Sequence, residues 1–281
     1  MIKLLVDSAS DIDLTEARDL GIELIPMLIT IGEKEYSDGV DLSHKEFFEK
    51  LIESDELPQT SQINECRFDE RFSALTANGD DVIAIVLSSK LSGTYDCACR
   101  AAQKYDGKVR VVDSLNASAG ERILCMHAVK LINEGRLSAA EIVDELNIKK
   151  TKIRFLALLG TLEYLKKGGR ISSVVALAGE MFSIKPVVSV TDGEVKLVGK
   201  AMGSKRGSNL LSQFIDKYGV NFDMPFALVY SGLTDEFLTK YITDSEKLWV
   251  GKTDYLPKYL IGSTIGTHIG PGAIGVAFFT E

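Results

Sequence analysis

Short apolar runs alternate with amphipathic stretches along the first half of the chain. The runs Ile2 to Val6, Val82 to Leu87 and Val109 to Val112 have the length of strands, and the second is apolar throughout. An uninterrupted apolar run predicts a strand that is buried on both faces, as in a parallel sheet covered by helices. Between these runs, apolar residues at helical spacing predict helices at residues 13–20, 43–52, 65–75, 92–105, 120–132 and 138–148.

Two stretches of this first half are less regular. Ile22 to Ile31 is apolar but contains Pro26, which lacks a backbone N–H, and this predicts an edge strand or a bulge. Pro58 to Gln62 is polar and is predicted to be a loop. A capping box at Ser43 opens one of the helices. The apolar face of that helix comprises Phe47, Phe48, Leu51 and Ile52.

The second half of the chain has a different pattern. Asp192 and Gly193 lie between the apolar runs Pro186 to Val190 and Val195 to Val198, and they predict a hairpin and hence antiparallel pairing. Further strands are predicted at residues 153–159, 226–230 and 273–279, and helices at 161–167, 207–218 and 236–241; residues 174–181 are apolar on most sides. With 281 residues, the chain is therefore predicted to be an α/β protein with two domains, residues 1–150 and 151–281.

Hydroxyl and carboxyl side chains follow each of the three apolar runs of the first domain. These pairs are Asp7-Ser8, Ser88-Ser89 and Asp113-Ser114. Because ligands of open parallel sheets bind outside the carboxyl ends of the strands, we expect the pairs to converge on one crevice. Ser92 lies at the predicted start of a helix, where backbone amides and hydroxyls suit a small anion, either phosphate or carboxylate. An ordinary serine N-cap explains Ser92 equally well.

Composition limits the classes of function. A net charge of -8 argues against nucleic-acid binding, which depends on clustered lysine and arginine. The sequence has neither a signal-peptide pattern nor an apolar run of spanning length, so stable membrane insertion is not expected. The four cysteines show no CxxC spacing and are interpreted as reduced thiols, which places the protein in the cytoplasm.

Metal and cofactor motifs are weak. The histidines His44, His127 and His268 are scattered, and the cysteines are not paired, so no metal site is predicted. Gly270 to Gly275 matches GxGxxG, but no helix or downstream acid follows it, and we reject it as a dinucleotide site. No cofactor is therefore expected.

A hydrolase with a Ser/His/Asp triad is the alternative function. Ser92 would be the nucleophile, His268 the base and Asp7 or Asp113 the orienting carboxylate. The chain lacks the GxSxG pattern of a nucleophile elbow, but a triad is defined by geometry and not by sequence position. This alternative stays open at the level of sequence.

Several short motifs along nearly the whole chain resemble the DegV family of bacterial fatty-acid-binding proteins. They are Asp7-Ser8-Ala9-Ser10, Thr60-Ser61-Gln62, Ser88 to Thr94, Val112-Asp113-Ser114, Leu162 to Ile171, Ile184-Lys185-Pro186 and Gly266 to Gly272. The resemblance implies a parallel-sheet amino-terminal domain, a mixed-sheet carboxyl-terminal domain and a tunnel for a long-chain fatty acid near their junction. Cys97 and Cys99 beside the predicted site helix are not part of the pattern.

The resemblance also implies the site residues and the partner. Thr60 and Ser92 are expected to hold the carboxylate, with Arg170 and His268 close to the head group. Both of the latter can carry positive charge, and whether they act on the acid or on an acyl phosphate stays open. Further motif residues expected at the fatty acid are Ser61, Gly93, Thr94 and Ser114. The chain itself is expected not to be an enzyme, because chemistry would belong to an ATP-binding fatty acid kinase subunit that receives the acid.

Overall fold

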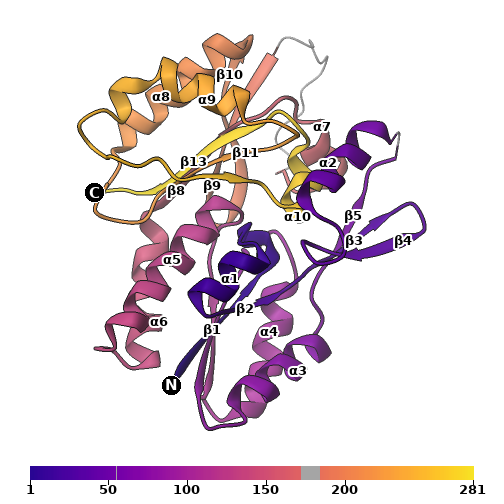
Figure 1. Ribbon diagram of the computed structural model, residues 1–281, viewed down its shortest axis with the longest axis vertical. Coiled ribbons are helices and arrows are strands. Elements are labelled where there is room, and N and C mark those ends of the chain that lie inside the picture. Colours follow the sequence, from indigo (N-terminus) through magenta and orange to yellow (C-terminus); the bar gives the residue numbers. More distant parts are fainter. Residues whose placement is uncertain (55, 172–183) are drawn as a thin grey trace.

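A parallel sheet forms the amino-terminal half of the computed structural model, which describes residues 1–54, 56–171 and 184–281 (Figure 1). Its strand order is β2-β1-β6-β7. The strands are β1 (Ile2–Asp7), β2 (Ile22–Ile25), β6 (Asp81–Val86) and β7 (Val109–Asp113), and all pairs are parallel. Leu4 and Ile83 enter one apolar core while Leu5 and Val82 enter another, which confirms strands that are buried on both faces.

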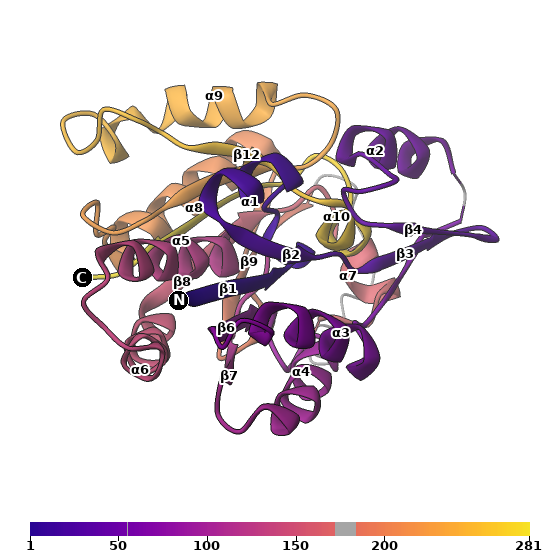
Figure 2. The same cartoon turned by 60° about the horizontal axis from the view of Figure 1, so that its bottom comes forward.

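Helices cover both faces of this sheet (Figure 2). One face carries α1 (Leu14–Leu20), α5 (Ala119–Glu134) and α6 (Ala139–Lys149), and the other carries α3 (Glu65–Thr76) and α4 (Thr94–Ala102). The predicted caps are present, since Asp13 accepts from the amides of Thr15 and Glu16, and Ser138 forms a capping box with Glu141. These local signals explain why the helix starts were predictable.

A mixed sheet forms the carboxyl-terminal half, with the order β10-β9-β8-β13-β11-β12. Its strands are β8 (Ile153–Leu158), β9 (Ile184–Thr191), β10 (Glu194–Met202), β11 (Ala227–Tyr230), β12 (Lys258–Leu260) and β13 (Ile274–Phe279). The pairs are antiparallel except β11 with β12, and the predicted Asp192-Gly193 hairpin joins β9 to β10. Helices α8 (Ser204–Tyr218) and α9 (Glu236–Asp244) cover its outer face, at the top of Figure 1.

A third, small sheet differs from the sequence prediction. It has the order β4-β3-β5 and comprises β3 (Leu28–Ile31), β4 (Lys34–Ser37) and β5 (Gln59–Ser61). The stretch around Pro26 is therefore two strands in two sheets and not one irregular strand. The predicted loop at residues 58–62 is wrong, because Gln59–Ser61 pairs with β3. In the figures, β3 and β4 extend from the side of the molecule.

Two helices close the space between the large sheets. Helix α7 (Glu163–Lys167) was predicted, whereas α10 (Ser263–Ile269) lies in a glycine-rich segment for which no helix was predicted. α10 packs on α2 (His44–Glu53), and a Cβ atom at Gly266 would lie 2.7 Å from a ring carbon of Phe47. Glycine is needed there because the two helices approach so closely. Ile52 of α2 is 54% exposed and does not belong to the apolar face that was predicted for it.

Short 3-10 turns complete the described elements. They are Ser8–Ser10, Gln103–Tyr105, Lys150–Lys152 and Glu246–Leu248. The apolar stretch predicted at residues 174–181 lies outside the described residues. Helix α5 contacts both large sheets, and one apolar core contains residues from both halves of the chain. The division into domains near residue 150 therefore stays a prediction.

Candidate functional site

A cavity of about 280 Å³ lies between the carboxyl edge of the parallel sheet and one face of the mixed sheet. Apolar side chains form most of its wall, and they come from the mixed sheet, from segments that follow strands of the parallel sheet, and from α10. Those from β8, β9 and β10 are Phe155, Ala157, Val188, Val190 and Val195, and those from α10 are Ile265 and Ile269. A mostly apolar cavity with a few polar groups is typical of a site for a small ligand with an apolar body.

The polar groups of the wall include most of the residues expected to hold a head group. Thr60, Ser92, Gly93, Arg170 and His268 all line the cavity, although they come from β5, the start of α4, the segment after α7 and α10. A second hollow of about 370 Å³ shares Thr60, Arg170 and His268 with the cavity. The expected head-group residues therefore lie where the apolar cavity meets a polar one.

The contact between Thr60 and His268 joins residues that are far apart in the sequence. Thr60 Oγ1 lies 2.9 Å from His268 Nε2. Burial, and then the charge of Arg170, lower the pKa of His268 to about 4, so the imidazole is neutral at pH 7. In the absence of an anionic ligand His268 is therefore not a cation, and its action on the acid or on an acyl phosphate stays a prediction. When Nε2 carries the proton, His268 donates to Thr60 and leaves the threonine proton for a ligand.

Thr94 supports the Ser92 hydroxyl in the same way as His268 supports that of Thr60. The two hydroxyl oxygens are 2.9 Å apart, and Thr94 N–H donates to Ser92 Oγ at 3.2 Å. Thr94 Oγ1 also accepts from Ile63 N–H at 3.2 Å, so Thr94 can donate its own proton to Ser92. The Ser92 proton is then available to the cavity. Thr94 itself is fully buried and supports Ser92 from outside the lining.

Arg170 connects the cavity wall to the end of α7. Its Nε donates to Leu91 O at 3.3 Å and its Nη1 to Gly168 O at 2.6 Å. The side chain is exposed, which suits a charged group at the border of the two hollows. The contact with Gly168, which caps α7, also agrees with the simpler interpretation of Arg170 as a helix C-terminal cation.

Besides Thr94, two of the expected residues are outside the cavity lining. Ser61 is exposed, and Ser114 is buried and donates to Asn116 O at 3.0 Å. Neither is among the described residues that line the cavity. Because successive side chains of a strand point to opposite faces, Ser61 of β5 cannot share the direction of Thr60.

The strand ends converge, but their polar groups hold the backbone. Asp7 accepts from Leu87 N–H and Asp113 from Ser89 N–H, at 2.8 Å and 3.2 Å, while Ser88 donates to Gly193 O. The loops that these contacts fix carry Ser92 and Gly93 to the cavity. Among the described residues no carboxylate contacts His268, whose Nδ1 has no hydrogen-bond partner. The hydrolase triad is therefore not assembled in the part of the chain described.

The model of a known family, "Uncharacterised protein, DegV family COG1307", matches residues 1–281. The chain belongs to the DegV family. A DegV domain-containing protein of Caldanaerobacter subterraneus is 34% identical over 282 residues, covering 100% of this chain and 99% of that protein. One from Clostridium perfringens is also 34% identical, over 99% of this chain and 97% of its own length. The family resemblance of the sequence motifs is thereby confirmed.

Solved DegV structures share the fold. A fatty-acid-binding DegV family protein from Thermus thermophilus has a TM-score of 0.88 at 27% identity, over 100% of this chain and 99% of its own. A stearic-acid-binding protein from Eubacterium ventriosum has a TM-score of 0.86 at 25% identity, over 100% and 98%. The predicted α/β fold, with a parallel sheet followed by a mixed sheet, is confirmed.

Three polar residues of this DegV cavity were missed at the level of sequence. Gln62, Ser118 and Thr264 line it together with the expected residues. Gln62 stands in the motif Thr60-Ser61-Gln62, which was a usable signal. Ser118 and Thr264 gave no such signal, because each is placed by contacts with distant acids, Asp11 and Asp38.

Buried carboxyl groups contact residues of the cavity wall, since Asp7 accepts from Leu87 N–H and Asp11 from the Ser118 hydroxyl. Burial raises the pKa of Asp7 to about 7 and that of Asp11 to about 6. Burial, then the charges of Asp7 and Asp11, raise the pKa of Glu121 well above its ordinary value. Both oxygens of Glu121 are without a hydrogen-bond partner in the described structure. No group of three or more His, Cys, Asp or Glu suited to a metal is found among the described residues, and none of their helices is both long and apolar enough to span a bilayer.

Glu121→Gln should become more stable relative to the wild type as the pH rises from 5 to 8. The raised pKa of Glu121 means that its favourable contribution is fully present below the ordinary value of 4.5 and is lost as the pH rises through the folded-state pKa. The unfolding free energy of Glu121→Gln minus that of the wild type should grow by up to about 1.4 kcal/mol per pH unit. Urea unfolding of both proteins at several pH values measures it, and a difference independent of pH would contradict the assignment.

Proposed function

We propose that the chain binds a long-chain fatty acid, such as palmitate, in this cavity and holds its carboxylate at Thr60 and Ser92. The observation that carries the proposal is an apolar cavity that ends at two hydroxyl groups, each supported by a neighbour so that it can donate. A carboxylate is acceptor-only, so two hydroxyl donors suit it without a general base. DegV structures described as binding stearic and heptadecanoic acid support the same ligand class.

The expected affinity comes mainly from the tail. Each buried methylene contributes about 0.8 kcal/mol, so about fifteen of them contribute on the order of 12 kcal/mol before ordering costs. The head group adds specificity, because hydrogen bonds to a charged acceptor contribute about 1.5–3 kcal/mol each. Such a ligand should remain bound through purification.

The second hollow is the side from which we expect another protein to reach the carboxylate. It is lined by polar groups such as Gln59 and Lys167, and it meets the fatty-acid cavity at Thr60, Arg170 and His268. We propose that a partner, an ATP-binding fatty acid kinase subunit of the cytoplasm, reaches the carboxylate from this side. In the ligand-free protein His268 is neutral, so we expect Arg170 to supply the first positive charge to a phosphorylated head group there.

The test is mass spectrometry of the lipid extracted from the purified protein, followed by titration of the delipidated protein with palmitate. We expect an acyl chain in the extract and saturable binding near one palmitate per chain. Recovery of nucleotide alone, together with no binding of palmitate, would contradict the proposal. Incubation with ATP and palmitate, with and without the partner, then shows whether phosphorylation depends on the partner.

A further inference from the structure

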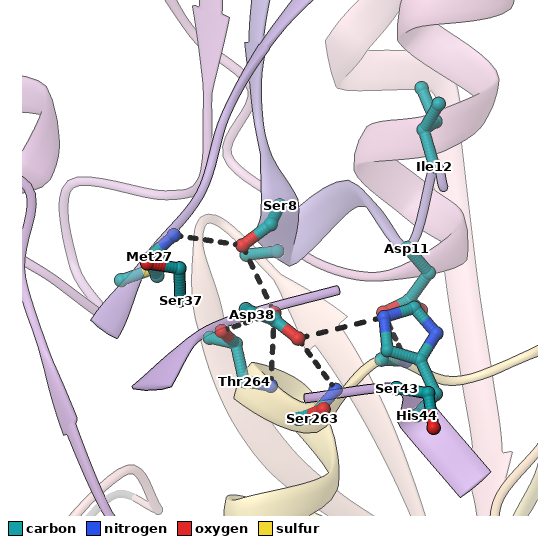
Figure 3. A network of polar contacts seen from close by, with 12 residues as sticks. Ser8, Asp11, Ile12, Met27, Ser37, Asp38, Ser43, His44, Ser263 and Thr264 are labelled. Atoms are coloured by element: carbon teal, nitrogen blue, oxygen red, sulfur yellow. Dashed lines mark hydrogen bonds and ion pairs between the residues drawn. The ribbon is translucent and has the colours of Figure 1, made fainter. Parts of the chain in front are cut away.

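Asp38 is a fully buried carboxylate outside the cavity that receives donors from three parts of the chain (Figure 3). It follows β4, and Figure 3 shows it between the end of β1, helix α2 and helix α10. Its donors are Ser8 Oγ at 3.0 Å, Ser263 N and Thr264 N at 3.2 Å each, and Thr264 Oγ1 at 2.6 Å. His44 Nε2 of α2 lies 3.5 Å away as its ion-pair partner.

These contacts fix the first turn of α10. A helix begins with backbone amides that have no partner within the helix, and a negative charge beside them is favourable. Here Asp38 accepts from Ser263 and Thr264, while Asp11 accepts from the N–H of Gly262 at 2.8 Å. The start of α10 is thus held by acids that come from the beginning of the chain.

Burying a carboxylate is unfavourable unless its charge is compensated. Burial alone would raise the pKa of Asp38, but the hydrogen bond and charge of His44, together with the hydrogen bonds from Thr264 and Ser8, outweigh it, and the pKa is lowered. Against the effect of burial, the hydrogen bond and charge of Asp38 raise the pKa of His44. The contact therefore favours the charged form of both groups, and Asp38 faces the amides of α10 as a carboxylate.

Helix α10 in turn carries one wall of the fatty-acid cavity. Thr264, Ile265, His268 and Ile269 line the cavity at helical spacing. Thr264 contacts Asp38, and His268 lies one turn further along the same face and contacts Thr60. A shift of α10 by one residue would move His268 by about 1.5 Å along the axis, enough to break a contact of 2.9 Å.

We infer that Asp38 and His44 are a positioning pair, which sets α10 so that His268 can support Thr60 at the head group. Neither residue lines the described cavity, so they act through α10 and not on the ligand. The inference rests on the proposed function for the identity of the ligand, but not for the geometry of α10.

The binding test compares Asp38→Asn with Asp80→Asn. Asp80 is also largely buried and ion-paired, with the Met1 amino group at 2.6 Å, but it precedes β6 at the opposite end of the parallel sheet. Asp38→Asn should weaken palmitate binding about tenfold and hexadecanol binding much less, because the defect lies at the head group. Asp80→Asn should leave both affinities within about twofold, as a distant site does. Equal losses for acid and alcohol in Asp38→Asn would overturn the inference.

A double-mutant cycle shows whether Asp38 acts through His268. In a His268→Ala background, Asp38→Asn should cost much less palmitate affinity than in the wild type, because the contact that it positions is already gone. The full tenfold loss in that background would overturn the inference. His44→Gln keeps a hydrogen-bond donor beside Asp38 but removes the charge, and it should give a smaller loss of palmitate affinity. If Asp38→Asn does not fold, His44→Gln replaces it in the same measurements.

A measurement without ligand separates this inference from the proposed function. The chain has three histidines, so their imidazole signals can be assigned by NMR from single substitutions. We expect His268 to titrate near pH 4 in the wild type and in Asp80→Asn, and closer to its ordinary value of 6.5 in Asp38→Asn, because a displaced α10 hydrates the ring. An unchanged His268 titration overturns the positioning pair, whereas a wild type that binds no fatty acid overturns only the proposed function.

Discussion

Replacing Ser92 with alanine should weaken palmitate binding about tenfold to a hundredfold. The serine hydroxyl lines the cavity, and its proton is left for the ligand by the contact with Thr94. Loss of one hydrogen bond to a charged group costs about 1.5–3 kcal/mol, which corresponds to that range. Thr60→Ala should have an effect of the same size, because its support by His268 is equivalent.

Ser61→Ala is the matched control for these variants. It removes the same hydroxyl group from the residue next to Thr60, but Ser61 is exposed and outside the described lining. Its palmitate affinity should equal that of the wild type in a fluorescence or calorimetric titration. If Ser61→Ala lost as much affinity as Ser92→Ala, the carboxylate would have to lie on the outer side of β5, and the proposed head-group site would be wrong.

Ala157→Phe should abolish most of the affinity for long acyl chains. Ala157 lies on β8 in the wall of the cavity, and an aromatic ring there occupies space that the tail needs. If the ring displaces about four methylenes at about 0.8 kcal/mol each, roughly 3 kcal/mol is lost, or about a hundredfold in affinity. The affinity for a short acid such as octanoate should fall much less.

A series of side chains of increasing size at position 157 tests whether the loss of affinity depends on the length of the acyl chain. Val, Leu and Phe at this position should shift the preferred chain length progressively downward in titrations with acids of eight to eighteen carbons. Ala140→Phe, at an exposed position of α6, controls for the added ring and should leave the preference unchanged. An equal loss for all chain lengths would mean that the substitution damages the fold and not the tail cavity.

The sequence predicted best those features that are encoded locally. Strand β6 is apolar from Val82 to Val86 because both of its faces are buried there. The helix starts at Asp13, Ser43 and Ser138 have capping side chains within the same turn. Such signals need no knowledge of the rest of the chain. The hydroxyl-rich loop at Ser92 was found for the same reason.

Features that depend on distant partners were missed. Strand β5 is polar, and only its pairing with β3 makes it a strand. Helix α10 contains Gly266 in its interior and is held by Asp38 and Asp11, more than two hundred residues earlier in the chain. Asp38 follows β4, and the neighbouring residues form no sequence motif that would single it out. The role of these residues is visible only once the fold brings them together.

The position of α10 and β13 in the chain also determines when the site can form during synthesis. β13 pairs with both β8 and β11 in the interior of the mixed sheet, and α10 supplies His268 to the head-group site. The ribosome makes residues 263–279 after every other residue that lines the cavity. A growing chain can thus complete its parallel sheet early, whereas the contact between Thr60 and His268 forms only after these residues have emerged. If the proposed function is correct, an unfinished chain therefore lacks one wall of the fatty-acid cavity.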